Sequence, residues 1–197
     1  MSLAIIDSGG ANISSVKHAL RRLGAEPVFT ADAATIRKAE RVILPGVGAA
    51  GAAISRLREL DLVECIRGLK QPVLGICLGM QLLFESSAED DVECLGIIPG
   101  KMKKLQAEAG LRVPHMGWNT TSVVRQDPLI NGLPADPWFY FVHSYYAPLS
   151  DHTLASCMHG QTFAAIVRYE NFYGAQFHPE RSARHGARLL ANFLEMK

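Results

Sequence analysis

PVLGICLGMQ, residues 72–81, is an apolar run that passes directly into a helical pattern. A short, uncharged apolar run is typical of a buried strand, and the glycines two places before and after Cys77 relieve crowding at a sharp strand-to-helix turn. Such a turn exposes its central side chain at the carboxyl edge of the sheet, where open α/β sheets bind their ligands. The stretch therefore predicts an α/β fold with Cys77 at a ligand-binding edge.

The rest of the first half alternates short apolar runs with helical patterns. Further strands are predicted at 3–6, 27–30 and 41–44. Helices are predicted at 13–23, from Asp32, through Ile54 and Leu57, and from a capping box formed by Asp61 and Glu64. Strands that alternate with helices imply parallel βαβ units and a sheet buried on both faces.

The second half is dominated by strand-like runs. These lie at 119–124, 139–146, 154–158, 162–169 and 172–177, the last two flanking a hairpin-like turn at Glu170-Asn171, and a helix through Leu190 and Phe193 closes the chain. The predicted fold class is therefore α/β. One domain over residues 1–197 would hold an open mixed sheet, mostly parallel, flanked by helices.

Composition narrows the functional classes. The 20 basic and 19 acidic side chains leave a net charge of +1, so the basic stripe of a nucleic-acid-binding protein is not indicated. The longest uncharged stretch, 42–55, contains Pro45 and three glycines and is too short for a membrane span. Leu3 to Ile6 is too short for a signal peptide. We expect a cytoplasmic protein that binds neither nucleic acid nor membrane.

The four cysteines are scattered, without a CxxC pair, and no His, Cys or Asp cluster has metal-ligand spacing. Neither a disulfide framework, a metal site nor a cofactor is therefore expected. A cysteine in an apolar strand is usually a core residue. The glycines and the strand-to-helix context favour a nucleophile at Cys77, because the helix N-terminus favours thiolate and the Leu78 N–H points toward a developing oxyanion.

A base for this nucleophile is predicted at the end of a distant strand, in QFHPE, residues 176–180. Residues two apart in an extended segment project to the same side, so His178 and Glu180 can converge, with Pro179 stiffening the backbone between them. The alternative is a surface histidine beside a surface carboxylate. His115 and His143 are expected to shape the pocket without a proton-transfer partner, and the other histidines, at 18, 152, 159 and 185, to face solvent.

A glycine-rich turn follows another strand, at Pro45-Gly46-Val47-Gly48. Without side chains at positions 46 and 48, its N–H groups can approach a ligand and complete an oxyanion hole facing Leu78. A phosphate-binding turn or a plain loop remains possible, although the absence of a following Gly-Lys-Ser/Thr excludes a P-loop.

Together, the segments 45–48, 75–81 and 177–180 resemble the class I (triad) glutamine amidotransferases. Segments 5–12, 113–119 and 140–145 extend the likeness over nearly the whole chain, to the glutaminase subunits of imidazole glycerol phosphate synthases. Two positions depart from the pattern, since Ser8 stands where many relatives carry an aromatic residue and Ala11 where many carry glycine. These departures leave the triad unchanged and affect contacts at that end of the sheet.

The resemblance implies a glutaminase. Cys77 would attack the glutamine side-chain amide, His178 would protonate the leaving ammonia, and Glu180 would orient His178. A γ-glutamyl thioester would form and be hydrolysed to glutamate. Val47 and Leu78 would supply the oxyanion N–H groups. The residues implied to hold glutamine are Gly46, Gly48, Gln81, Ser144 and Tyr145.

The resemblance also implies a heterodimer in histidine biosynthesis. The ammonia would pass directly into a cyclase subunit with a (β/α)₈ barrel fold, and Asn12, Trp118 and Arg181 are candidates for the subunit interface. Two other functions stay open on the residues alone. One is a cysteine hydrolase acting on another ester or amide, and the other is a non-catalytic binding or scaffold subunit that kept the fold.

Overall fold

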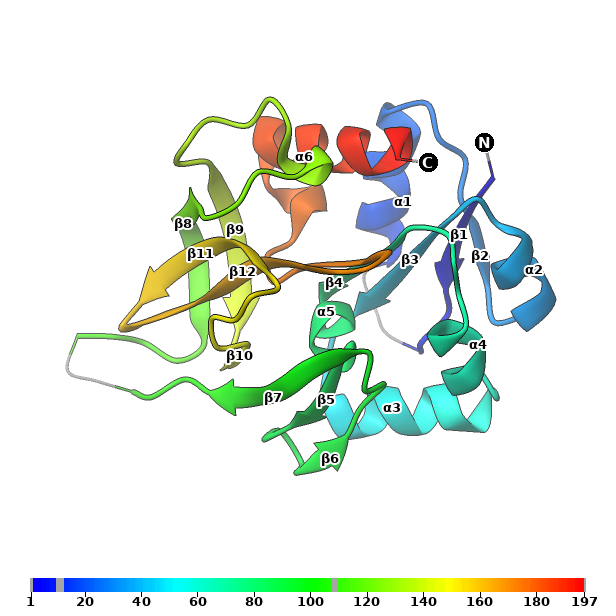
Figure 1. Ribbon diagram of the computed structural model, residues 1–197, viewed down its shortest axis with the longest axis horizontal. Helices are drawn as coiled ribbons and strands as arrows, with labels where there is room; N and C mark the ends of the chain where they lie inside the picture. Colours follow the sequence, from blue (N-terminus) through cyan, green and yellow to red (C-terminus); the bar gives the residue numbers. More distant parts are fainter. Residues whose placement is uncertain (1, 10–12, 108–109, 197) are drawn as a thin grey trace.

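The structure is a computed structural model that describes residues 2–9, 13–107 and 110–196. The interface candidate Asn12 and the departure at Ala11 lie outside the described residues. Within the described part of the chain, the strands form a central nine-stranded sheet and a smaller four-stranded sheet. Figure 1 shows the central sheet running between two layers of helices.

The central sheet is mixed. Its order is β2 (Val28–Thr30), β1 (Leu3–Ile6), β3 (Arg41–Gly46), β4 (Val73–Cys77), β13 (Phe172–Ala175), β12 (Gln161–Tyr169), β11 (Thr153–His159), β8 (His115–Val123) and β9 (Trp138–His143). Pairing is parallel from β2 to β13 and antiparallel from β13 to β9. The expected α/β fold with a mixed sheet is confirmed, although its pairings divide evenly and are not mostly parallel.

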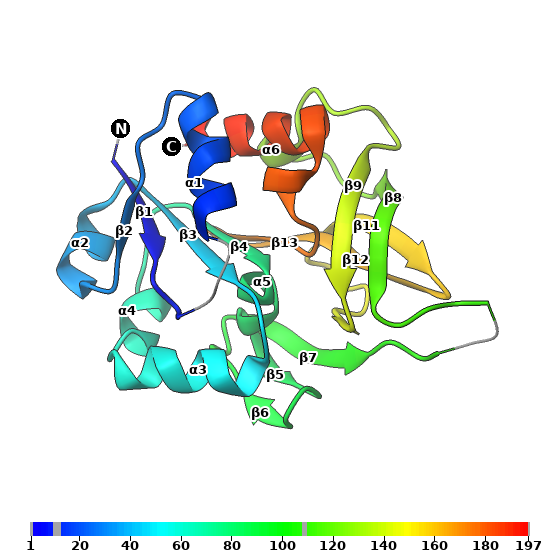
Figure 2. The same ribbon diagram turned by 180° about the vertical axis from the view of Figure 1, so that it is seen from behind.

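Helices cover both faces of the sheet (Figures 1 and 2). One face carries α1 (Ile13–Arg22), η1 (Pro128–Ile130) and α6 (Ala183–Glu195), and the other carries α2 (Ala33–Lys38), α3 (Ala50–Glu59), α4 (Val63–Arg67) and α5 (Leu78–Leu82). Each layer buries its own apolar core against the sheet, as the uncharged strands require. None of these described helices is long and apolar enough to cross a membrane.

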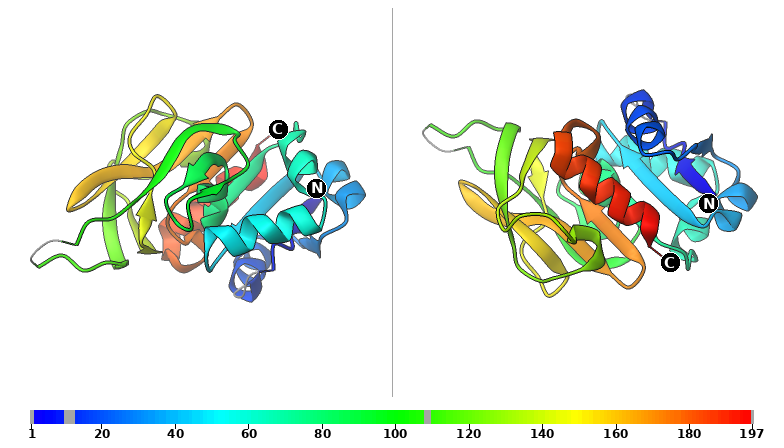
Figure 3. Two further views of the ribbon diagram at one scale, coloured as in Figure 1. Left: turned by 90° about the horizontal axis from the view of Figure 1, so that it is seen from below. Right: turned by 90° about the horizontal axis from the view of Figure 1, so that it is seen from above.

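The four-stranded sheet was not predicted from the sequence. It has the order β10 (Tyr145–Tyr146), β7 (Ile98–Lys104), β5 (Phe84–Ser87) and β6 (Val92–Glu93), and Figure 3 shows β7 extending beyond the helical layer. The single strand expected over 139–146 is therefore wrong. It divides at Ser144 into β9 of the central sheet and β10 of the smaller one.

One helix start was also predicted incorrectly. The N-cap of α4 is Leu62, which makes no side-chain capping bond, and Asp61 has a φ of 53° in the turn before it. The expected capping box with Glu64 therefore does not form. By contrast, the predicted start at Asp32 is confirmed, because its carboxylate accepts a 2.7 Å hydrogen bond from the N–H of Thr35.

Candidate active site

Cys77 lies at the junction between β4 and α5, at the carboxyl end of the parallel part of the sheet. Its backbone has φ 52° and ψ −111°, a conformation that L-residues rarely adopt. The side chain is nearly buried, at 7% exposure, yet it lines a cavity of about 310 Å³. The strained turn thus presents the sulfur to a partly open cavity at the sheet edge, while the side chain also packs in the apolar core.

Glycines permit the close packing that makes this turn. A Cβ atom on Gly79 would collide with the carbonyl oxygen of Leu44 in β3, and one on Gly46 would lie 2.6 Å from the Gly79 nitrogen. The turn at residues 45–48 can therefore rest directly against the start of α5. The hydroxyl of Ser8 adds a buried 3.0 Å hydrogen bond to the carbonyl of Pro45, so the departure at this position tethers the same turn.

His178 follows β13 and is held from three directions. Its Nδ1 lies 2.9 Å from Oε1 of Glu180, with only 9% and 1% of the two side chains exposed. Its N–H donates to the carbonyl of Tyr140 at 2.9 Å, and its own carbonyl accepts from the Ser182 hydroxyl at 2.7 Å. This pair is buried, unlike a surface histidine beside a surface carboxylate.

The route by which His178 meets Glu180 differs from the expected one. The segment after His178 is not extended, because Pro179–Arg181 forms the 3₁₀ helix η2 with His178 as its N-cap. The tight turn, rather than two-residue alternation, brings the carboxylate back to the ring. Burial alone would lower the pKa of His178, but the Cys77 side chain and the Glu180 carboxylate outweigh it and raise that pKa to about 10.

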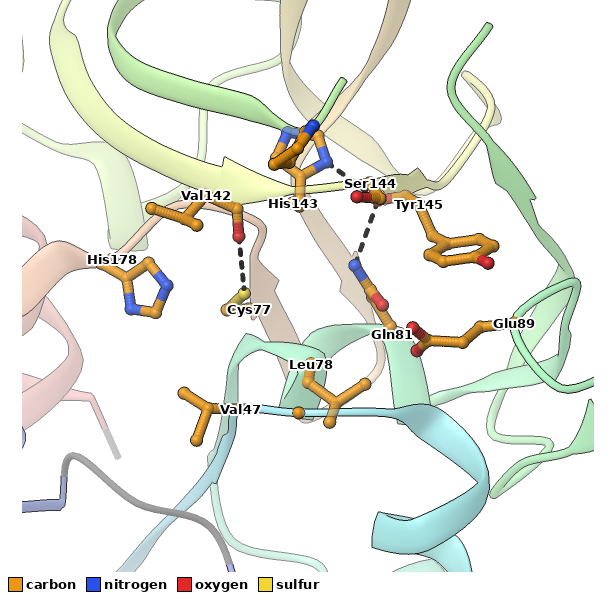
Figure 4. A pocket seen from close by; sticks show the side chains of 12 residues that line it. Val47, Cys77, Leu78, Gln81, Glu89, Val142, His143, Ser144, Tyr145 and His178 are labelled. Atoms are coloured by element: carbon orange, nitrogen blue, oxygen red, sulfur yellow. Dashed lines mark hydrogen bonds between the residues drawn. The ribbon is translucent and has the colours of Figure 1, made fainter. Parts of the chain in front are cut away.

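The cavity gathers most of the predicted site residues from distant segments. Figure 4 shows the His178 ring beside the Cys77 sulfur, with Val47 and Leu78 on the wall below them. Of the predicted residues, the cavity is lined by Val47, Gly48, Cys77, Leu78, Gln81, Ser144, Tyr145 and His178. Gly46 lies behind this wall against Gly79, and Glu180 lies behind His178. Trp118 and Arg181 are not among the lining residues.

A family model described as Glutamine amidotransferase class-I matches residues 4–196 of the chain. The chain belongs to the class I glutamine amidotransferase family. Relatives named imidazole glycerol phosphate synthase subunit HisH include that of Xanthomonas euvesicatoria pv. vesicatoria (strain 85-10), 56% identical over 98% of this chain and 97% of the relative. The HisH of Xylella fastidiosa (strain Temecula1 / ATCC 700964) is 53% identical with the same coverage.

Solved structures show the same fold at low sequence identity. A structure described as that of a glutamine amidotransferase superposes with a TM-score of 0.75 at 21% identity, covering 99% of this chain and 98% of that one. PurLQS from Thermotoga maritima gives a TM-score of 0.70 at 20% identity, covering 98% and 97%. At such identities the likeness bears on the fold alone.

The sequence interpretation missed three residues of this amidotransferase site. Glu89, after β5, directs its carboxyl group toward the cavity beside Gln81 (Figure 4) and accepts a 2.8 Å hydrogen bond from the Ala50 N–H. Burial raises the pKa of Glu89. The carbonyl of Val142 lies 3.6 Å from the Cys77 sulfur. Gln176 is fully buried, with its Nε2 3.9 Å from the same sulfur.

Several expectations for the histidines need correction. His115 and His143 do have a partner, because Nδ1 of His115 and Nε2 of His143 lie 3.0 Å apart. His143 Nδ1 donates to the Tyr145 carbonyl at 2.8 Å, so its Nε2 accepts and His115 donates. Of the four histidines expected to face solvent, His18 is exposed, whereas His159 stacks on His115 at 4.0 Å. His152 and His185 are half-buried.

The described residues contain no cluster of three or more His, Cys, Asp or Glu side chains suited to a metal ion. The cysteines other than Cys77 are buried thiols, at positions 65, 94 and 157. Burial raises the pKa of Cys94 to about 11 and that of Cys157 to about 12, so both are poor nucleophiles at neutral pH. Cys77 is thus set apart from the other thiols by its turn and its cavity.

Proposed function

We propose that this chain is the glutaminase subunit of an imidazole glycerol phosphate synthase, in which Cys77, His178 and Glu180 convert L-glutamine to glutamate and ammonia. One observation carries the proposal. A sulfur at a strained strand-to-helix turn shares a cavity with an imidazole that is paired to a buried carboxylate. A nucleophile, a base and an orienting acid in this order are the elements of acyl transfer through a covalent intermediate.

The reaction proceeds in two steps. With the Cys77 proton already held on the His178 ring, the sulfur attacks the glutamine amide carbon as a thiolate, and the N–H groups of Val47 and Leu78 stabilise the oxyanion. With its raised pKa, the His178 ring holds the proton that it gives to the departing ammonia. A water molecule, deprotonated by the now neutral ring, then hydrolyses the γ-glutamyl thioester and releases glutamate.

The cavity also offers groups that suit the amino-acid end of glutamine. The Glu89 carboxylate, missed by the sequence interpretation, suits the substrate ammonium group. The strand around Ser144 and Tyr145 suits its carboxylate, and Gln81 and Gly48 complete the pocket. Gly46 contributes through packing, since its lack of a side chain lets the turn at residues 45–48 approach α5.

The ammonia acceptor is a cyclase subunit with a (β/α)₈ barrel, docked on the outer face of β8 and β9. Met116, Trp118 and Trp138 are 64%, 50% and 52% exposed on this face, so it presents three large apolar side chains to solvent. Val142, in register with Met116, also lines the cavity, so this face adjoins the site of ammonia release. Docking there would keep ammonia from being protonated in water.

Two interface candidates fit this face. Trp118 lies across from Tyr140 in the β8–β9 ladder, and the guanidinium of Arg181 lies 6.0 Å from the Tyr140 ring centroid. Asn12 remains a candidate outside the described residues. The proposal also retains a single glutaminase domain over residues 1–197 and a cytoplasmic location, as predicted from the sequence.

Glutamate release by the chain alone and with its cyclase tests the proposal. We expect weak activity alone, strong activation in the assembled complex, and no glutamine use by Cys77→Ala, whose complex still runs on added ammonium salts. A glutamine-derived chloroketone should modify Cys77, as detected by mass spectrometry. Absence of the adduct would favour a hydrolase for another ester or amide, and absence of glutamate release would favour a scaffold protein without catalytic activity.

A further inference from the structure

Gln176 is a fully buried polar residue directly after β13, and its side chain contacts Cys77 and Gln81, two residues that line the cavity. Its N–H continues the pairing with β12 by donating to the Ala165 carbonyl at 2.9 Å. Its side chain projects to the same side of the chain as that of His178, two residues later, and its Nε2 lies 3.9 Å from the Cys77 sulfur. The segment that follows β13 therefore places both the His178 imidazole and the Gln176 carboxamide near Cys77.

The hydrogen-bond network determines which way this carboxamide points. Nε2 of Gln81 lies 3.1 Å from the Tyr145 carbonyl, which can only accept, so this end of Gln81 is the NH₂ group. The same NH₂ donates to Oε1 of Gln176 at 3.1 Å. The NH₂ group of Gln176 must then face the Cys77 sulfur, 3.9 Å away.

Two neighbours of the sulfur favour opposite protonation states. The Val142 carbonyl, 3.6 Å away, can accept a hydrogen bond from a thiol but offers nothing to a thiolate. The Gln176 amide donates, so it interacts most strongly with a negatively charged sulfur. Such a donor acts on the nucleophile before substrate is attacked and again when the thioester is broken and the sulfur leaves as an anion.

We propose that Gln176 is a further catalytic residue of this site, whose carboxamide donates a hydrogen bond to the Cys77 sulfur while it holds Gln81 in its substrate-facing position. The inference rests on the proposed glutaminase function and assigns the amide a role in it. An apolar residue of similar volume would leave the sulfur without this donor and the Gln81 amide without one of its two acceptors.

The test compares Gln176→Met with the wild-type chain. Alkylation of Cys77 by iodoacetamide is followed by mass spectrometry as a function of pH, and glutamine turnover is measured in the complex with the cyclase. A hydrogen bond to a charged group is worth roughly a factor of 10 to 150. We therefore expect the midpoint of the alkylation profile to rise by about one pH unit or more, with kcat falling about 10-fold or more.

Asn192→Leu is the matched control. Asn192 is a buried carboxamide in α6 whose NH₂ group donates to the carbonyls of Leu129 and Asn131 rather than to the Cys77 sulfur. Its loss should lower stability while leaving the alkylation midpoint of Cys77 in place. A purely structural role for Gln176 predicts the same behaviour for Gln176→Met, and an unchanged midpoint and kcat in that variant would overturn the inference.

Gln176→Glu keeps the contact with Gln81 while changing the contact with the Cys77 sulfur. It is the test variant to use if Gln176→Met does not fold. The new carboxyl is nearly isosteric and can still accept from Gln81, but when ionised it places a like charge beside the sulfur. Its alkylation midpoint should move up at least as far as in Gln176→Met, and an unshifted midpoint would again refute the inference. If the wild-type complex itself releases no glutamate, the proposed function fails instead.

Discussion

His178 Nδ1 lies 2.9 Å from Oε1 of Glu180, while the second carboxylate oxygen of Glu180 is buried without a hydrogen-bond partner in the described structure. The carboxylate therefore makes its one side-chain hydrogen bond to the imidazole, whose positive charge balances its negative charge. A buried carboxylate oxygen without a hydrogen-bond partner lowers the stability of the folded state. Here it keeps the ring protonated and fixed in orientation.

Glu180→Gln should lower the pKa of His178 from about 10 toward its ordinary value of 6.5, because a neutral amide no longer favours the imidazolium. Glutamine turnover in the complex should fall by about 100-fold or more, the usual scale of general acid–base catalysis. Histidine NMR titration measures the first effect and steady-state kinetics the second. A wild-type titration midpoint for His178 in the variant would contradict the proposed orienting role.

The buried pair His115 and His143 predicts acid sensitivity. Burial, with a smaller contribution from neighbouring histidines, lowers the pKa of His115 to about 4 and that of His143 to about 3. The unfolded chain, with histidine pKa values near 6.5, binds more protons in between, so stability falls as pH drops below 6.5 toward these values. The stabilisation is fully present only above pH 6.5.

His115→Phe combined with His143→Gln should therefore flatten the dependence of unfolding free energy on pH between about 6.5 and 4. Glutamine can still donate to the Tyr145 carbonyl, which keeps this contact. Urea denaturation at a series of pH values provides the measurement. His18→Gln, which replaces an exposed histidine, is the control and should keep the wild-type slope.

Gly79→Ala should destabilise the protein severely, by more than about 3 kcal/mol, because its Cβ would overlap the Leu44 carbonyl, a backbone atom that cannot rotate away. Gly24→Ala is the control, since its φ is +81° but nothing lies near the added carbon. It should cost only about 1–2 kcal/mol of backbone strain. Urea unfolding of both variants compares them directly, and equal losses would argue against the close approach of β3 and α5.

The sequence identified the part of the site that local backbone chemistry determines. Residues 72–81 carry an apolar strand and glycines at fixed offsets from Cys77, so the turn follows from a ten-residue window. His178 and Glu180 were found by spacing, although the 3₁₀ turn that joins them was not. That turn depends on the Ser182 hydroxyl, which binds the His178 carbonyl and the Tyr140 N–H, so strand β9 has a part in it.

The features that the sequence did not predict depend on distant contacts. Glu89 accepts from the Ala50 N–H, 39 residues away in sequence, and Gln176 contacts Cys77, 99 residues away. Neither contact can be recognised from the residues adjacent in the sequence. The four-stranded sheet escaped prediction because β7 buries only Ile98 and Met102 and is interrupted by Pro99 and Gly100, a pattern without period-two alternation. Its partner β5 pairs with it in parallel, and parallel strands are not joined by the short hairpin turn that would be recognisable in the sequence.

Trp118 should be an energetic centre of the proposed cyclase interface. It is a large aromatic side chain, half-exposed, that meets the Tyr140 ring edge-on at 6.0 Å between centroids. Aromatic residues at the centre of an interface commonly contribute about 2 kcal/mol or more to binding. We expect Trp118→Ala to weaken the complex by about 30-fold or more in calorimetric titration, with the fold of the free chain unchanged.

Val28→Ala is the control for this prediction. Val28 is 53% exposed on β2, at the end of the nine-stranded sheet opposite β9, so its truncation removes exposed apolar surface far from the proposed interface. It should leave cyclase affinity unchanged. Equal affinities for wild type and Trp118→Ala would move the docking site off the outer face of β8 and β9.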